Sequence, residues 1–138
     1  MRGWQVGVVL GVVAGILLLI WAEPLRAQGK ATSLSDARAA VEANMTTAAG
    51  KDYDAQFGAG IAQKHLGPVK QCKQSAGGDL TSFWILFKLD KDGGVREMLL
   101  YPETKLGMCA RELLSKDRFS TVPPRAGYWV SVYMKLSH

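Results

Sequence analysis

Apolar and polar positions follow different periods in different parts of this chain. Residues 6–22 are apolar without one charged side chain. After Ser33 apolar residues recur at helical spacing, and from residue 82 to residue 101 they recur at every second position. A short helical pattern and a last alternating segment follow. This order predicts an N-terminal hydrophobic segment and then one small domain of helices and strands.

Two amphipathic helices are predicted at the start of the domain. Ser33 or Ser35 can cap the first helix, and Ala49-Gly50 is expected to end it. The second helix is expected to cover residues 52–65, because Gly67-Pro68 would break it. The apolar residues at helical spacing are Leu34, Ala37, Val41 and Met45 in the first helix and Tyr53, Phe57, Ile61 and Ala62 in the second.

Three strands and one more helix are predicted after Cys72 and the polar loop at residues 74–79. Aromatic and branched residues favour strands, and an Asp-Gly-Gly sequence favours a hairpin turn. The expected segments are a strand at 82–89, a hairpin turn at 90–94, a return strand at 95–101, a helix at 106–114 and a strand at 128–136.

The fold class that follows is α+β, with the element order α-α-β-β-α-β. A return connection through a helix to the far side of the first strand gives a three-stranded antiparallel sheet of order 2-1-3, packed by helices. Arg96, Glu97 and Lys135 mark the second and third strands as edges, because charge there discourages aggregation. The predicted core residues are Phe83, Ile85, Phe87, Leu113, Val130 and Val132.

Residues 1–27 have the three regions of a secretory signal peptide. Arg2 gives the short basic start, residues 6–22 the apolar centre, and Ala27 a small residue before a cleavage position. Leu25 is bulkier than the usual residue two places earlier, and 17 apolar residues are at the short end of what spans a bilayer. An uncleaved inner-membrane anchor is therefore the alternative. Residues 28–32 are a polar linker, and residues 33–138 are the exported domain.

Charge and cysteine content exclude several classes of function. Removing Arg2, Arg26 and Glu23 from the totals of 17 basic and 12 acidic residues leaves residues 28–138 with a net charge of about +4. These charges are scattered, whereas a nucleic-acid site would be a basic stripe. A metal site needs three or four ligands at short spacing, so neither metal nor cofactor is expected. In an exported chain Cys72 and Cys109 predict a disulfide, with two buried free thiols as the alternative.

Residues 83–136 resemble the C-terminal domain shared by TonB and TolA, the periplasmic arms of Gram-negative energy-transducing systems. The resemblance lies in Leu89-Asp90-Lys91-Asp92-Gly93, Gly94-Val95, Cys109-Ala110, Phe119 followed by Pro123-Pro124, and the last alternating strand. The cysteine pair is similar to that of TolA, which joins a cysteine before the first strand to one in the crossover helix. A long proline- or alanine-rich spacer and a histidine in the hydrophobic segment are missing, so the resemblance implies binding without force transduction.

The resemblance implies a periplasmic module that binds a protein or peptide by pairing a partner strand to a sheet edge. The last strand is the favoured edge, although a homodimer would compete for it. The predicted partner-binding residues are Trp84, Tyr128, Trp129, Val130 and Tyr133.

Trp84 and Trp129 are placed on the face opposite the main apolar set, with Leu86, Met98, Leu100 and Tyr133. This face would be an exposed aromatic patch unless the two N-terminal helices cover it. The alternative function is a small exported enzyme or enzyme inhibitor that shares only the fold. His65 is the only histidine before the last residue, and no nucleophile, base and orienting group can be picked out around it, so catalysis is not expected.

Overall fold

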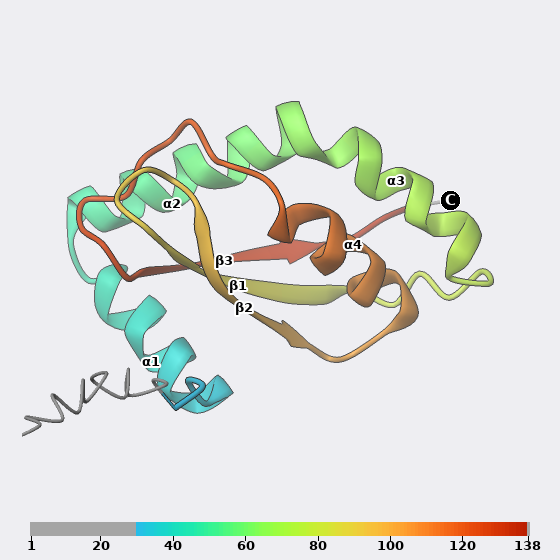
Figure 1. Cartoon of the computed structure of the whole chain (residues 1–138), viewed down its shortest axis with the longest axis horizontal. Helices are drawn as coiled ribbons and strands as arrows, with labels where there is room; N and C mark the ends of the chain where they lie inside the picture. Colours follow the sequence, from blue (N-terminus) through green and yellow to red (C-terminus); the bar gives the residue numbers. More distant parts are fainter. Residues whose placement is uncertain (1–29, 138) are drawn as a thin grey trace, which may run out of the picture. The chain divides into compact units, whose positions relative to one another are not determined.

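A three-stranded antiparallel sheet carries helices on both of its faces (Figure 1). The computed structural model describes residues 30–137. The strands are β1 (Phe83–Leu89), β2 (Val95–Tyr101) and β3 (Tyr128–Met134), in the order β2-β1-β3. The helices are α1 (Leu34–Asn44), α2 (Ala48–Gly60), the π-helix η1 (Ile61–His65), α3 (Leu66–Ser75) and α4 (Lys105–Ser115). The predicted α+β class, element order and strand order 2-1-3 are confirmed.

The core lies between one face of the sheet and the helices α2, η1, α3 and α4. Alternate residues of β1 point into it and are fully buried, namely Phe83, Ile85, Phe87 and Leu89. The rings of Phe57, Phe87 and Phe119 meet edge to face with centroids 4.9 to 5.5 Å apart. This geometry suits the ring quadrupoles. We call this side of the sheet the core face and the opposite side the second face.

The hairpin between β1 and β2 forms where it was predicted. The amide of Gly93 donates to the carbonyl of Asp90 at 3.0 Å, and the amide of Asp90 donates to the carbonyl of Gly94 at 2.9 Å. Gly93 has φ +83°, and a Cβ there would lie 2.0 Å from the carbonyl oxygen of Phe119. Only glycine meets both conditions without strain.

The first helix ends earlier than predicted. α1 ends at Asn44, and Ala49-Gly50 lie in the first turn of α2, so the expected end at these residues is wrong. The Thr47 hydroxyl caps α2 by accepting from the amide of Gly50 at 3.0 Å. A Cβ on Gly50 would lie 1.7 Å from the carbonyl oxygen of Asn44. Glycine is needed here for the close approach of two helix ends and does not terminate either helix.

The predicted break at Gly67-Pro68 is also wrong. α2 continues through η1 into α3, and Figure 1 shows the three as one long helical stretch. In η1 the amide of Leu66 donates to the carbonyl of Ile61, five residues back. Pro68 follows directly after this shift in the hydrogen-bond pattern, and the helix continues through it. Cys72 consequently lies in a helix and not after one.

Most of the predicted core is confirmed, with one error in α4. Phe83, Ile85, Phe87 and Val130 are buried, and Val132 is partly buried against the core. Leu113 is 38% exposed, so its predicted burial is wrong. The buried stripe of α4 follows four-residue spacing and consists of Leu106, Ala110 and Leu114.

The predicted leader at residues 1–27 lies outside the described residues. Among residues 30–137, no helix is both long enough and apolar enough to cross a bilayer. Of the linker predicted at residues 28–32, Thr32 is fixed to the domain. Its amide and hydroxyl donate to the Glu97 carboxylate at 2.8 and 3.0 Å.

Candidate functional site

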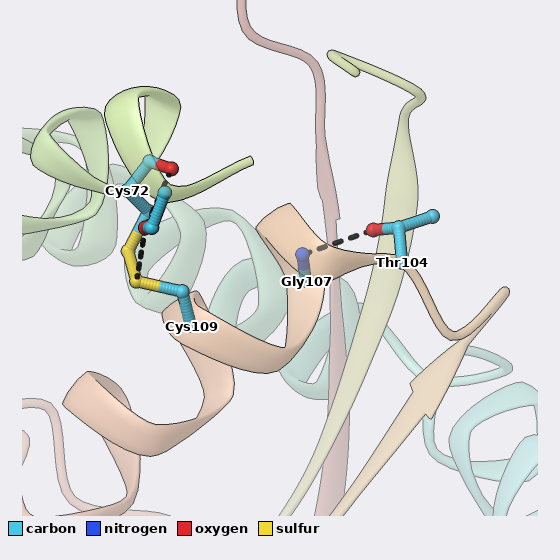
Figure 2. The surroundings of a disulfide bond; sticks show 5 residues. Cys72, Thr104, Gly107 and Cys109 are labelled. Atoms are coloured by element: carbon cyan, nitrogen blue, oxygen red, sulfur yellow. Dashed lines mark hydrogen bonds between the residues drawn. A yellow bond between two sulfur atoms is a disulfide. The ribbon is translucent and has the colours of Figure 1, made fainter. Parts of the chain in front are cut away.

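The cysteine pair joins the two helical segments on the core face (Figure 2). Cys72 of α3 and Cys109 of α4 form a disulfide with a Cα–Cα distance of 5.8 Å, inside the usual range for such bonds. α4 begins nearby, where the Thr104 hydroxyl caps the helix by accepting a hydrogen bond from the amide of Gly107 at 2.9 Å. The predicted disulfide is confirmed, and it fixes α4 against α3 over the sheet.

The second face is covered along one half by α1. Trp129 and Leu86 are buried beneath this helix, against Ala37 and Val41. The helix crosses all three strands, because Thr32 before it binds Glu97 of β2 and Asn44 at its end reaches β3. The expectation that the N-terminal helices cover this face holds for the half that contains Trp129.

The other half of the second face presents three aromatic side chains in a row. Cross-strand pairing puts Trp84 of β1 opposite Tyr101 of β2 and opposite Tyr133 of β3. Their exposed fractions are 44%, 52% and 51%, and the Trp84 and Tyr133 ring centroids are 4.9 Å apart. We call these three residues the aromatic row. Two of its members, Trp84 and Tyr133, belong to the predicted aromatic patch and remain exposed.

A groove runs between α1 and the aromatic row. Its volume is about 280 Å³, and we call it the transverse groove because both of its walls cross the strands. Leu34, Arg38, Val41 and Glu42 line it from α1, and Trp84, Leu86, Tyr101 and Ser131 line it from the sheet. A concave, mainly apolar site with a few polar groups is the usual form of a binding site.

The predicted partner-binding residues do not come together as one surface. Tyr128, Trp129 and Val130 are buried, with exposed fractions of 3%, 6% and 2%, so their side chains offer no surface to a partner. Trp84 and Tyr133 are exposed and adjacent.

The sequence interpretation missed Tyr101 and misplaced two residues of β2. Met98 and Leu100 pack into the core, while Leu99 and Tyr101 lie on the second face. The register shift between Lys88 and Leu89 changes which residues of β2 lie opposite β1. Tyr101 could have been placed on the second face from its position opposite Trp84 in the hairpin. That placement requires the correct hairpin register, including the shift between Lys88 and Leu89.

The outer edge of β3 offers backbone groups for pairing. The Asn44 side-chain amide donates to the carbonyl oxygen of Trp129 at 2.9 Å, so this carbonyl points away from β1. The backbone groups of successive residues in a strand point alternately to its two sides. The N–H and C=O groups of Ser131 and Tyr133 therefore point away from β1 as well. Within residues 30–137, no other hydrogen bond from a neighbouring element reaches this edge between Trp129 and Met134.

A second groove lies between this edge and the long helical stretch. We call it the edge groove; its volume is about 140 Å³. Small and apolar residues of the helices line one side, namely Gly58, Ile61, Ala62 and Leu66, and residues 132–136 line the other. Side chains of a strand paired with β3 would alternate between the edge groove and the second face.

Two buried tyrosines hold the loop that leads into β3. The Tyr53 hydroxyl donates to the carbonyl of Thr121 at 3.0 Å, and its ring meets that of Tyr128 edge to face. Burial, with a smaller contribution from Tyr128, raises the pKa of Tyr53 above its ordinary value. Burial also raises the pKa values of Tyr128 and Asp54. These groups position the loop at residues 121–127 and the start of β3.

Two polar pairs flank the end of η1. Nδ1 of His65 lies 2.6 Å from a carboxylate oxygen of Asp117, and the ammonium group of Lys64 donates to the Ser120 hydroxyl at 3.1 Å. Lys64 and Ser120 are exposed, and the adjoining cavity is only about 10 Å³. A nucleophile needs a base held beside it and room for a substrate, and this small cavity leaves no such room. We interpret the two pairs as structural contacts that hold the end of η1 against the loop before β3.

In the described part of the chain, no group of three or more His, Cys, Asp or Glu side chains could hold a metal ion. Comparison with known proteins gives no further guide, since no protein-family model, curated protein or solved structure matches this chain. We therefore infer the function from the geometry of the sheet edge and of the second face.

Proposed function

We propose that this protein is a periplasmic binding module that captures an extended segment of a partner protein by adding it as a strand to the outer edge of β3. The observation that carries the proposal is the outward set of backbone groups at Ser131 and Tyr133 beside the edge groove. An edge with free N–H and C=O groups is a template for strand addition. The adjoining groove gives the added strand a place for every second side chain.

The resemblance of residues 83–136 to the C-terminal domain of TonB and TolA agrees with this proposal. Strand addition at an edge is what that resemblance implies. The order β2-β1-β3 and the disulfide between the helix before β1 and the crossover helix α4 are the features that support it. Export to the periplasm belongs to the same proposal and rests on the residue pattern at 1–27.

The opposite edge, on β2, is less suited to this role. The groove beside β2 has a volume of about 520 Å³, but Arg96, Glu97, Arg111 and Glu112 line it. Charged side chains along an edge oppose pairing with another strand. In addition, Arg118 bridges to Gly94 just before β2 begins, which occupies that end of the edge.

The edge groove can be filled without disturbing the fold. A Cβ added at Gly58 would meet no atom within 4 Å, and the same is true of Gly67, an exposed residue of α3 outside the edge groove. Gly58→Leu puts a side chain into the groove, and Gly67→Leu is its matched control. Gly58→Leu replaces a helical glycine and should stabilise the helix slightly. Gly67→Leu places a Cβ directly before Pro68 and should destabilise it slightly, so the unfolding of both variants is measured before their binding is compared.

The test begins with a phage-displayed library of random linear peptides selected on the purified chain. We expect a selected peptide to slow amide exchange at Ser131 and Tyr133. We expect Gly58→Leu to weaken its binding by about tenfold or more, equivalent to ~1.4 kcal/mol, and Gly67→Leu to leave it unchanged. Protection confined to β2 or to the helices, equal affinities for both variants, or failure to select any peptide would contradict the proposal.

A further inference from the structure

The aromatic row has the chemistry of residues found at the surface of lipid bilayers. Trp and Tyr present an apolar ring with a polar N–H or O–H group, and they are enriched at the level of lipid headgroups. Trp84, Tyr101 and Tyr133 form a continuous row across three strands, each about half exposed. A contiguous exposed apolar surface of this kind indicates an interaction site, whereas single exposed apolar residues do not.

The chain enters the domain on this same face. Thr32 is held by two hydrogen bonds to Glu97, whose place opposite Lys88 in the β1–β2 register puts it on the second face. Leu34, two residues later, lines the transverse groove. Only nine residues lie between Thr32 and the end of the apolar run at Ala22, so ten Cα–Cα steps join the two. An extended chain of that length reaches at most about 35 Å, so an inserted apolar run would keep Thr32, which is bound to the second face, within that distance of the bilayer surface.

The transverse groove has one cationic side chain that suits a lipid phosphate. Arg38 lines the groove, and guanidinium groups bind phosphate oxygens through paired hydrogen bonds. Of the acidic groups on this face, Glu97 is already engaged by Thr32 and lies 3.8 Å from the ammonium group of Lys88. Glu42 stands one helical turn after Arg38 on the groove wall. The net charge of about +4 on residues 28–138 adds attraction to anionic lipid.

We propose that the second face docks on an anionic phospholipid surface, with the rings of the aromatic row at headgroup level and a lipid phosphate beside Arg38. The bound surface uses side chains of all three strands and of α1, with Tyr133 as its contribution from β3. The outer backbone edge of β3 lies to the side of it, so lipid docking and strand addition are separate events. Docking would present that edge to partners at a fixed height above the bilayer.

Tryptophan emission tests the proposal in the full chain. Replacing Trp4 and Trp21 by Phe leaves Trp84, which is exposed, and Trp129, which is buried under α1, as the reporters. The protein is reconstituted in vesicles of phosphatidylcholine and phosphatidylglycerol, with or without bromine on the acyl chains near the glycerol. We expect brominated lipid to reduce the emission of this parent and to have no effect once Trp84→Phe is added.

A reporter on the far side of the sheet separates docking from mere tethering. Leu113 is exposed on α4, which packs on the core face, so Leu113→Trp in the Trp84→Phe background should keep its emission in brominated vesicles. Arg38→Gln should weaken the quenching of Trp84 in phosphatidylglycerol vesicles. Equal quenching at positions 84 and 113 would overturn the proposal. So would Trp84 emission that ignores brominated lipid but responds to the peptides selected for the β3 edge, which would assign the row to peptide binding.

Discussion

Asn44 and Trp129 join the end of α1 to the outer edge of the sheet. The side-chain amide of Asn44 donates to the backbone carbonyl of Trp129 at 2.9 Å, and its side-chain oxygen accepts from Arg125 at 2.7 Å. One residue thus holds both the edge strand and the loop that precedes it. The contact also occupies the first outward group of β3, so an added partner strand would begin its pairing at Ser131.

Removing this contact should loosen α1 from the sheet. Asn44→Ala leaves the partly buried Trp129 carbonyl without its donor, and we expect the free energy of unfolding to fall by about 1–2 kcal/mol. Asn44→Asp keeps an acceptor for Arg125 but loses the donor to Trp129, so it should also destabilise. Urea unfolding of the three proteins measures the effect. Changes within about 0.5 kcal/mol, as for ordinary surface positions, would show that the contact contributes little.

Reducing the disulfide should cost the domain a large part of its stability. Cys72 and Cys109 are 37 residues apart, and closing a loop of that length in the unfolded chain is worth about 4 kcal/mol in the chain-entropy model. We expect a similar decrease on reduction or in a Cys72→Ser/Cys109→Ser variant. Mass spectrometry of the protein purified without reductant should show the loss of two hydrogen atoms, and two alkylatable thiols would contradict the bond.

The neighbouring leucines of α4 provide a matched pair for the core. Leu114 is 1% exposed and Leu113 is 38% exposed, although the two are adjacent in the sequence. Leu114→Ala should lower the free energy of unfolding by about 2–5 kcal/mol, and Leu113→Ala by less than about 1 kcal/mol. Denaturant unfolding compares them directly. Similar losses at both positions would mean that α4 is rotated about its axis relative to this structure.

Alkaline pH should unfold the domain through Tyr53. Burial raises the pKa of Tyr53 above the ordinary value of 10.0, so above pH 10 the unfolded state loses this proton while the folded state keeps it. Stability therefore falls as pH rises above 10, with a slope of at most about 1.4 kcal/mol per pH unit for one proton, reduced by solvent screening.

Urea unfolding between pH 8 and pH 11 gives this slope. Tyr53→Phe should flatten it, although the variant also loses the hydrogen bond to Thr121 and starts from a lower stability. Tyr133→Phe, at an exposed tyrosine, should leave the slope as it is. A slope unaffected by Tyr53→Phe would assign the alkaline transition to other groups.

The local pattern of the sequence was enough to predict the sheet and its order. Alternation in β1 and the Asp-Gly-Gly turn define the hairpin, because a strand has a period of two and the turn requires a positive φ at Gly93. The alternation of β3 and the apolar spacing of α4 complete the order 2-1-3. The cysteine pair could be predicted as well, since two cysteines behind a leader-like N-terminal pattern favour a disulfide.

Tertiary contacts decided what the sequence pattern left open. Whether Trp84 or Trp129 is exposed depends on where α1 crosses the second face. That position is set by contacts from Thr32 to Glu97 and from Asn44 to Trp129, which join residues 65 and 85 positions apart. The helix continues past Pro68 because η1 shifts the hydrogen-bond pattern before it. The periodicity of apolar residues indicates which face of the sheet a side chain is on. It does not indicate whether an element distant in the sequence, such as α1, covers that face.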